Sequence, residues 1–385
     1  MTHVLYSFPH PVGGVGIGTV AWHHVDSLAR AGARVTVVCT ALHRSFDPRL
    51  PIRVVPVLGP IRPRMIGRAR AADLVDRMTA RQLRIARPDV VHTWPRAVLR
   101  TAARAAELGV PSVREAPSPY TRTAISEAAA AWTAVGLDVP AGHFHRIPES
   151  VLALEDREFS AVDLVLVGSP EAARSFDAAP VPVRVCVNRY GFDAAGFHRR
   201  ERSDRARTAV FIGRAEPAKG VHVLLRAWSR AHRPRDTRLL IRGAIPPDVR
   251  QLLAGELDDP SVVECPPVDD IGAFLAGTDV LIHPSFSEGS ALVTYEALGA
   301  GVVPLVSTAA GSPVRHDVDG LVHATGSEAE LVCHLERVLT DPAEWSRLRA
   351  NGESSAPGWT WDAAAARMLE LYRGLGSSSP TATAS

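Results

Sequence analysis

Short apolar runs alternate with longer amphipathic segments along most of this chain. The apolar runs are rich in Val, Ile and Leu and end at Gly, Pro or Asp, which is typical of strands buried on both faces of a parallel sheet. The longer segments place apolar residues three or four positions apart, as helices do. The pattern predicts an α/β protein in which helices cover both faces of parallel sheets.

Two cycles of this alternation lie on either side of a polar, arginine-rich stretch, residues 198–208. We predict that this stretch links two domains, residues 1–198 and 199–360, each large enough to bury its own core. The strands expected in the first domain are 4–8, 35–39, 52–57, 90–92, 112–114, 164–167 and 183–187. Those expected in the second domain are 209–212, 238–241, 261–264, 280–282 and 302–306.

The end of the chain and one internal stretch stand outside this alternation. A closing helix is expected over 361–376, after the turn residues Pro357 and Gly358, and residues 377–385 are expected to be disordered. Residues 115–158 give no continuous pattern beyond a helical composition at 128–132.

The amino-acid composition argues against several classes of protein. A hydrophobic content of 46% with 6% aromatic residues is ordinary for a soluble α/β protein, and no apolar run approaches the length of a membrane span. The N-terminus lacks the basic start and apolar core of a signal peptide, so we expect a cytoplasmic protein. The four cysteines are scattered singly, which argues against a zinc site and against a disulfide framework.

The net charge of +2 is too small to indicate a nucleic-acid partner. It conceals a local excess of arginine between Arg62 and Arg87, a stretch whose only acids are Asp73 and Asp76. We interpret this run as a solvated helix face. The alternative is weak contact with an anionic membrane surface, which would place the protein peripherally at the inner face of the membrane, or contact with an acidic partner.

The only lysine of the chain is Lys219, within the string G-R-A-E-P-A-K-G that follows an apolar run. Arg214 lies five positions before it in the same string. A compact ammonium and a planar guanidinium on a glycine-bounded loop before a helix suit a diphosphate better than a carboxylate. The alternative is a lysine left on the surface of a chain that otherwise uses arginine.

A second string, His283 to Leu298, follows a buried-looking strand and holds Glu288 and Glu296, eight residues apart. If the chain is helical from Ser290, eight positions correspond to ~12 Å of rise, so that the two carboxylates could grip hydroxyls at either end of a diphosphate-bridged ligand. The backbone N–H groups of the helix start favour an anion between them. They belong to Gly289, Ser290, Ala291, Leu292 and Val293.

The combination G-R-x4-K-G followed about seventy residues later by E-x7-E resembles the donor-binding signature of glycosyltransferase family 4. Weaker similarities to that family extend over nearly the whole chain. They are the glycine loop 13–18, P-D-V-V-H at 88–92, Y-G-F-D at 190–193 and D-V-D-G-L-V at 317–322. The resemblance implies a GT-B fold, in which two Rossmann-like parallel-sheet domains face a cleft. It also implies a retaining glycosyltransferase that moves a hexosyl group from a nucleoside-diphosphate sugar to an acceptor hydroxyl.

The resemblance also assigns roles to residues. It implies that Arg214 and Lys219 bind the donor diphosphate, that Glu288 contacts the transferred sugar and that Glu296 contacts the ribose. Gly14 and Gly16 are expected near the phosphates, residues 265–268 near the base, and the helix 361–376 against the first domain. The nucleotide sugar, which we expect to be uridine-linked, is then a co-substrate, and neither a cofactor nor a metal is expected. The acceptor is expected to be a small molecule, a sugar or a lipid-linked glycan.

One departure from the family concerns the acceptor side. Many relatives carry a histidine after the fifth strand of the first domain, where this chain has Arg114-Glu115-Ala116-Pro117. We expect Glu115, and His92 at the end of the preceding strand, to face the acceptor. A structural role is the alternative for His92.

Four other interpretations compete with this one. Gly16-x-Gly18-x-x-Ala21 matches a dinucleotide fingerprint, but no acid ends the second strand, as an oxidoreductase would need. Asp317-Val318-Asp319 matches a metal-binding D-x-D but precedes Gly320 in a turn, so we expect it to be structural. A nucleotide-sugar epimerase of the same architecture remains the nearest alternative, and a carbohydrate-binding module a more distant one.

Overall fold

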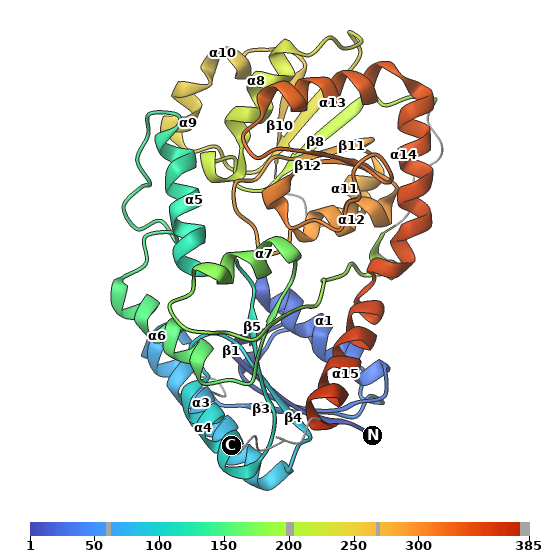
Figure 1. Cartoon of the computed structure of the whole chain (residues 1–385). Helices are drawn as coiled ribbons and strands as arrows, with labels where there is room; N and C mark the ends of the chain where they lie inside the picture. The colour runs from blue at the N-terminus through green and yellow to red at the C-terminus, as the bar shows by residue number, and fades with distance from the viewer. Residues whose placement is uncertain (59–62, 198–203, 267–269, 378–385) are drawn as a thin grey trace, which may run out of the picture.

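The computed structural model describes residues 1–58, 63–197, 204–266 and 270–377. Two sheets form the centres of two domains, one above the other, with helices packed around them (Figure 1). Neighbouring strands pair in parallel throughout both sheets. The predicted α/β class with two parallel-sheet domains is confirmed.

The first domain is built on a seven-stranded sheet in the order β3-β2-β1-β4-β5-β6-β7. Its strands are β1 His3–Val12, β2 Arg34–Leu42, β3 Ile52–Pro56, β4 Val90–Thr93, β5 Ser112–Ala116, β6 Leu164–Val167 and β7 Val185–Val187. The helices between them are α1 Ile17–Arg30, α2 Pro63–Ile66, α3 Arg68–Ala86, α4 Leu99–Leu108, α5 Thr121–Thr133, α6 Glu149–Ser160 and α7 Pro170–Ser175.

The second domain is built on a six-stranded sheet in the order β10-β9-β8-β11-β12-β13. Its strands are β8 Thr208–Ile212, β9 Arg238–Arg242, β10 Val262–Cys265, β11 Val280–His283, β12 Val303–Ser307 and β13 Leu321–His323. Its helices are α8 Val221–Arg230, α9 Pro247–Leu252, α10 Ala254–Leu257, α11 Ile271–Ala276, α12 Leu292–Ala300, α13 Glu328–Thr340 and α14 Pro342–Ser355.

The last helix, α15 (Trp361–Ser377), returns to the first domain and lies beside α1 (Figure 1). Its buried residues, among them Met368 and Tyr372, join the core formed by β1, β2 and α1. Apart from the segment around α5 described below, the chain passes to the second domain after β7 and returns to the first before α15. The two crossings pair with each other, because Phe192 and Trp359 share a backbone hydrogen bond of 3.0 Å and Trp361 donates to the carbonyl of Phe192 at 3.2 Å.

Helix α5 leaves the first domain and packs against the second. It starts after β5 of the first domain but rises beside the second (Figure 1). Its residues Ala128 and Trp132 belong to the core of the second domain, together with Ala218 and Val221. A segment of the first half of the sequence is therefore part of the second domain in space.

Each strand expected from the sequence is present, several of them longer than expected, and β13 was missed. One helix was placed wrongly: α12 begins at Leu292, with Ala291 as its N-cap, and not at Ser290. Ala291 is outside the helix because its backbone is extended, with φ −72° and ψ 101°, and its N–H pairs with the carbonyl of Ala310 across the turn. The expected boundary at 198/199, the tail from 378 and Arg62 lie outside the described residues.

Candidate active site

A cavity of about 290 Å³ lies between the two domains, at the carboxyl ends of strands from both sheets. The first domain contributes Gly16, Ile17, Val20, Pro117 and Tyr190 to its lining. The second contributes Ile212, Gly213, Lys219, His283, Glu288, Ser290, Ala291, Leu292 and Val293. Sequence strings that are far apart in the chain are thus brought to one site.

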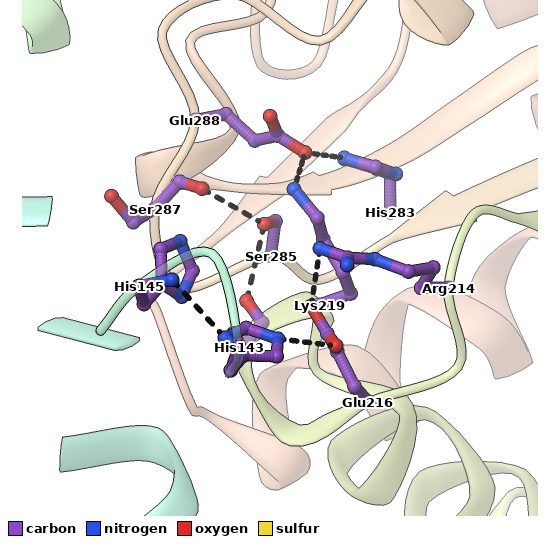
Figure 2. A network of polar contacts seen from close by, with 10 residues as sticks. His143, His145, Arg214, Glu216, Lys219, His283, Ser285, Ser287 and Glu288 are labelled. Atoms are coloured by element: carbon purple, nitrogen blue, oxygen red, sulfur yellow. Dashed lines mark hydrogen bonds and ion pairs between the residues drawn. The ribbon is translucent and has the colours of Figure 1, made fainter. Parts of the chain in front are cut away.

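Lys219 and Glu288 form the charged centre of this site. The Lys219 Nζ lies 2.6 Å from the Glu288 Oε1, and the His283 Nε2 lies 3.1 Å from the same oxygen (Figure 2). Burial opposes ionisation of Glu288, but the Lys219 ammonium and the His283 imidazole outweigh it and lower the pKa of the carboxyl to about 2. The carboxylate is therefore charged at any ordinary pH and keeps the ammonium at the cavity.

Lys219 is placed by a short 3-10 turn, Pro217–Lys219, which ends at Gly220. Gly220 has a φ of 73° and passes so close to Pro284 that a Cβ at that position would lie 2.1 Å from the Pro284 carbonyl oxygen. Only glycine fits there. The second glycine of the sequence string is thus needed to join the lysine turn to α8.

Arg214 lies beside the same turn but does not line the cavity. Its side chain is half exposed, and its Nη2 lies 3.1 Å from the Glu216 Oε1. The face of the guanidinium stacks on the ring of Phe144, with 4.0 Å from the guanidinium carbon to the ring centroid. Arg214 and Lys219 thus lie in one loop, residues 213–220. Arg214 pairs with the carboxylate of Glu216, and Lys219 pairs with that of Glu288.

The turn before α12 is fixed against the first domain. A Cβ on Gly289 would lie 2.1 Å from the Pro117 carbonyl oxygen, and the Ser169 hydroxyl donates to the Gly289 carbonyl at 2.7 Å. Because the N–H of Ala291 is used by Ala310, its expected role as a free anion donor is wrong. The N–H groups of Leu292 and Val293, in the first turn of α12, have no partner inside the helix and face the cavity side.

The family of this chain follows from its matches to family models. Residues 14–195 match the family model described as Glycosyltransferase Family 4, and residues 206–341 match the model described as Glycosyl transferases group 1. The chain belongs to glycosyltransferase family 4. The two models together cover most of both domains of this family 4 chain.

Curated relatives match over about half of their length. A D-inositol 3-phosphate glycosyltransferase of Thermobispora bispora is 29% identical over 183 residues, which are 43% of this chain and 43% of the relative. An MMP alpha-(1->4)-mannosyltransferase of Mycolicibacterium hassiacum is 31% identical over 220 residues, 54% of this chain and 53% of the relative. The epimerase alternative finds no support in these comparisons.

Solved structures match over the whole length. A sucrose-phosphate synthase from Thermosynechococcus elongatus superimposes with a TM-score of 0.70 at 18% identity, covering 98% of this chain and 100% of the other. The Anabaena protein HepE, in complex with UDP and glucose, gives 0.67 at 16% identity, with 97% and 100% covered. At these identities the likeness shows the fold, and it confirms the expected GT-B architecture of this family 4 chain.

Two further predicted donor residues stand apart from the cavity lining. Glu296, on the second turn of α12, is part-buried, and burial raises the pKa of its carboxyl to about 7, partly offset by Arg242. Gly14 lies in the loop before α1, where its carbonyl accepts a hydrogen bond from Thr19, while Gly16 does line the cavity. Of the stretch predicted to face the base, residues 267 and 268 lie outside the described residues.

The acceptor-side prediction for His92 and Glu115 needs correction. Both side chains are fully buried under the cavity, with exposed fractions of 0% and 1%. His92 Nδ1 shares a hydrogen bond of 2.7 Å with the Tyr372 hydroxyl, and the Tyr190 hydroxyl donates to Glu115 Oε1 at 2.8 Å. Two hydrogen bonds thus tie Glu115 to Tyr190, which lines the cavity, and His92 to Tyr372 of α15, while the His92 Nε2 and the Glu115 Oε2 lie 3.3 Å apart without forming a hydrogen bond.

Among the described residues, one group of side chains has the composition of a metal site: His24, His92 and Glu115, whose ligand atoms lie within 4.8 Å of one another. Each of the three shares its other polar atom with a tyrosine hydroxyl, His24 with Tyr6 at 3.1 Å and the other two as described above. The atoms of this group that face one another, the His24 Nε2, the His92 Nε2 and the Glu115 Oε2, are buried and have no hydrogen-bond partner among the described residues.

No helix in the described ranges of the chain is long and apolar enough to cross a bilayer. The described part of the predicted basic run forms α2 and α3, and the α3 residues Arg77, Arg81 and Arg84 line a groove together with residues of α4. Its contact with a membrane surface remains a prediction.

Four residues that contribute to the site were not predicted from the sequence: Tyr190, Pro117, His143 and Phe144. Tyr190 was noted only as part of a motif, and its ring lines the cavity floor. Pro117 was noted only as the end of the string 114–117, which stands where many relatives carry a histidine. His143 and Phe144 belong to the stretch 115–158 that gave no pattern, and no local signal could have placed them, because their partners lie in the other domain.

Proposed function

We propose that this chain is an enzyme that transfers a hexosyl group from a nucleoside-diphosphate sugar to an acceptor hydroxyl, with retention of the anomeric configuration. The observation that carries the proposal is the Lys219 ammonium, held 2.6 Å from Glu288 at a cavity between two Rossmann-like domains. The named activities of the curated relatives support it. A uridine-linked sugar is the donor we favour, since the related fold of HepE is described in complex with UDP and with UDP-glucose.

The chemistry follows from the charges. As the bond to the anomeric carbon breaks, negative charge grows on the departing diphosphate. Lys219, Arg214 and the N–H groups that open α12 are fixed before the reaction and stabilise that charge without reorganisation. Glu288 holds the ammonium in place and has a second oxygen, Oε2, for a hydroxyl of the sugar.

No side chain in the described lining is placed as a nucleophile opposite the cations. We therefore assign retention to departure and attack on the same face of the sugar, with the leaving phosphate accepting the proton of the acceptor hydroxyl. This differs from retaining glycosidases, which use a pair of carboxylates.

The first test is Lys219→Ala assayed for acceptor-dependent release of UDP from UDP-hexoses. We expect kcat/KM to fall ~100-fold or more, because a preorganised oxyanion stabiliser is lost. His232→Ala, an exposed site in the second domain, is the matched control and should leave turnover unchanged. Near-wild-type turnover of the Lys219 variant would refute the proposal.

Because Lys219 is the only lysine, amine chemistry gives a second test of the same site. A lysine-acylating reagent should modify Lys219 and the α-amino group alone, and UDP should protect only Lys219. Peptide mass spectrometry with and without UDP reads this directly, and labelling of Lys219 that ignores UDP would contradict a diphosphate site.

A further inference from the structure

The stretch between α5 and α6 comes from the first domain but lies against the second. Leu137 and Val139 pack on the core of the second domain, beside Trp132 at the end of α5. The tip of the stretch is His143–Phe144–His145. Figure 2 shows His143 and His145 beside the segment that carries Arg214 and Lys219, and Phe144 between them stacks on Arg214. The tip is thus fixed to the domain that carries the cations.

Glu216 is the point at which the tip meets that segment. Its carboxylate is buried, with 3% of the side chain exposed, and it is shared between two partners. Oε1 accepts from the Arg214 Nη2 at 3.1 Å, and Oε2 lies 3.0 Å from the His143 Nε2. A buried carboxylate with both oxygens satisfied competes less strongly for the remaining N–H groups of Arg214.

The tautomer of His143 follows from its neighbours. The backbone N–H of His145 donates to the His143 Nδ1 at 3.3 Å, so Nδ1 is the acceptor and the ring proton is on Nε2. His143 therefore donates to Glu216 as a neutral imidazole. Its role does not need a protonated ring.

Phe144 holds the other side of the same arginine. Its ring is 47% exposed, so core burial does not explain its position, yet it lies 4.0 Å from the Arg214 guanidinium carbon. Stacking uses the face of the guanidinium and leaves its in-plane N–H groups free to meet phosphate oxygens. A long side chain that is otherwise half exposed is thereby restricted to one orientation.

We propose that His143 and Phe144 are positioning residues for the diphosphate site, contributed by the first domain and acting through Arg214 and Glu216. The inference rests on the proposed function, since it places a diphosphate in front of Arg214. Ordering the arginine before the ligand arrives removes that entropy loss from binding.

The test titrates the full chain by calorimetry with UDP and with inorganic pyrophosphate, which mimics the diphosphate group of a nucleoside-diphosphate sugar. Phe144→Leu keeps apolar bulk but removes the ring face, and should weaken both ligands about two- to fivefold. Phe144→Tyr restores a ring and should bind like the wild type. His143→Ala should weaken binding as well, whereas His143→Gln, which offers an amide N–H near the position of Nε2, should restore it.

A double-mutant cycle separates positioning from a general structural effect. In an Arg214→Ala background, Phe144→Leu should cause no further loss, because its only route to the ligand is gone. His232→Ala is again the matched control. In turnover, the change should appear in the donor KM rather than in kcat.

Three results would overturn the inference: wild-type affinity in Phe144→Leu and His143→Ala, no rescue by the Tyr and Gln variants, or additive losses in the cycle. If the wild-type chain binds neither UDP nor pyrophosphate, the proposed function fails first.

Discussion

Glu288 and Glu296 carry the same side chain in opposite surroundings. The Lys219 ammonium and His283 keep the pKa of Glu288 at about 2, whereas burial raises that of Glu296 to about 7, with Arg242 as a partial offset. Near neutral pH the first is a fixed anion and the second is half protonated. If Glu296 accepts hydrogen bonds from ribose hydroxyls, its ionisation controls how well it does so.

Glu296→Gln tests this through pH. A carboxyl whose pKa is raised on folding stabilises the folded state when protonated, so its contribution is lost as pH rises from the unfolded value toward 7. The unfolding temperature of Glu296→Gln, compared with the wild type, should therefore improve from pH 5 to pH 8. UDP affinity of the wild type should rise over the same range and that of the variant should not. Parallel pH profiles for the two proteins would contradict both expectations.

Single residues were predictable where their chemistry is local. Lys219 and Glu288 stand in short strings whose glycines and neighbouring strands are readable in the sequence, and the structure brings them together. His92 and Glu115 were misplaced because their burial depends on Tyr372, which lies 280 residues after His92 and covers it from α15. The local sequence does not distinguish a strand end that is open to the cleft from one that is covered by a helix far away in the chain.

At the scale of elements, the turn before α12 joins the two domains. Gly289 has an ordinary φ, so its glycine is not needed for backbone conformation; it is needed for space, since a Cβ would lie 2.1 Å from the Pro117 carbonyl oxygen. A contact this short with backbone cannot be relieved by a side-chain rotation, so the backbone at Gly289 or at Pro117 would have to shift.

Gly289→Ala should therefore push the α12 turn away from Pro117. We expect a fall in kcat/KM of roughly 100-fold, since a displacement of about an ångström at a positioned group can cost that much. Gly255→Ala, at a glycine with no atom within 4 Å of the added Cβ, is the matched control. Wild-type turnover in Gly289→Ala would mean that the contact between the domains does not matter for the reaction.

Elements were predictable where hydrophobic periodicity sets them. The strands of both sheets followed from runs such as 164–167, which is a strand with the same ends in the structure. Helix α12 was extended too far because the extended backbone of Ala291, in the turn that pairs with Ala310, has no signal in the local sequence. Helix α5 was legible as helical composition, but its transfer to the other domain was not, because local pattern carries no information about which core an apolar face will join.

At the scale of the whole molecule, two segments link the domains, one after β7 and one before α15. Phe192 and Thr360 pair at this crossing, and a Cβ on Gly191 would lie 2.4 Å from the Thr360 carbonyl carbon. Two short segments held together in this way form a narrow connection about which the domains can turn.

We expect the unliganded protein in solution to be more open on average than this structure, and UDP to close it. Small-angle scattering should then show a smaller radius of gyration with UDP than without. The radius of gyration of the Lys219→Ala variant should not change when UDP is added. A wild-type profile that does not respond to saturating UDP would argue against closure.

The course of α5 bears on how such proteins can be recombined. A chimera joined at the arginine-rich linker would give its second domain a partner helix from a different relative, with apolar residues that no longer match Ala218 and Val221. An exchange that keeps residues 121–147 with the second domain would preserve that core and the ring that stacks on Arg214. The functional unit for donor binding is therefore discontinuous along the polypeptide, and engineered donor preference should follow this composite unit rather than either half of the gene.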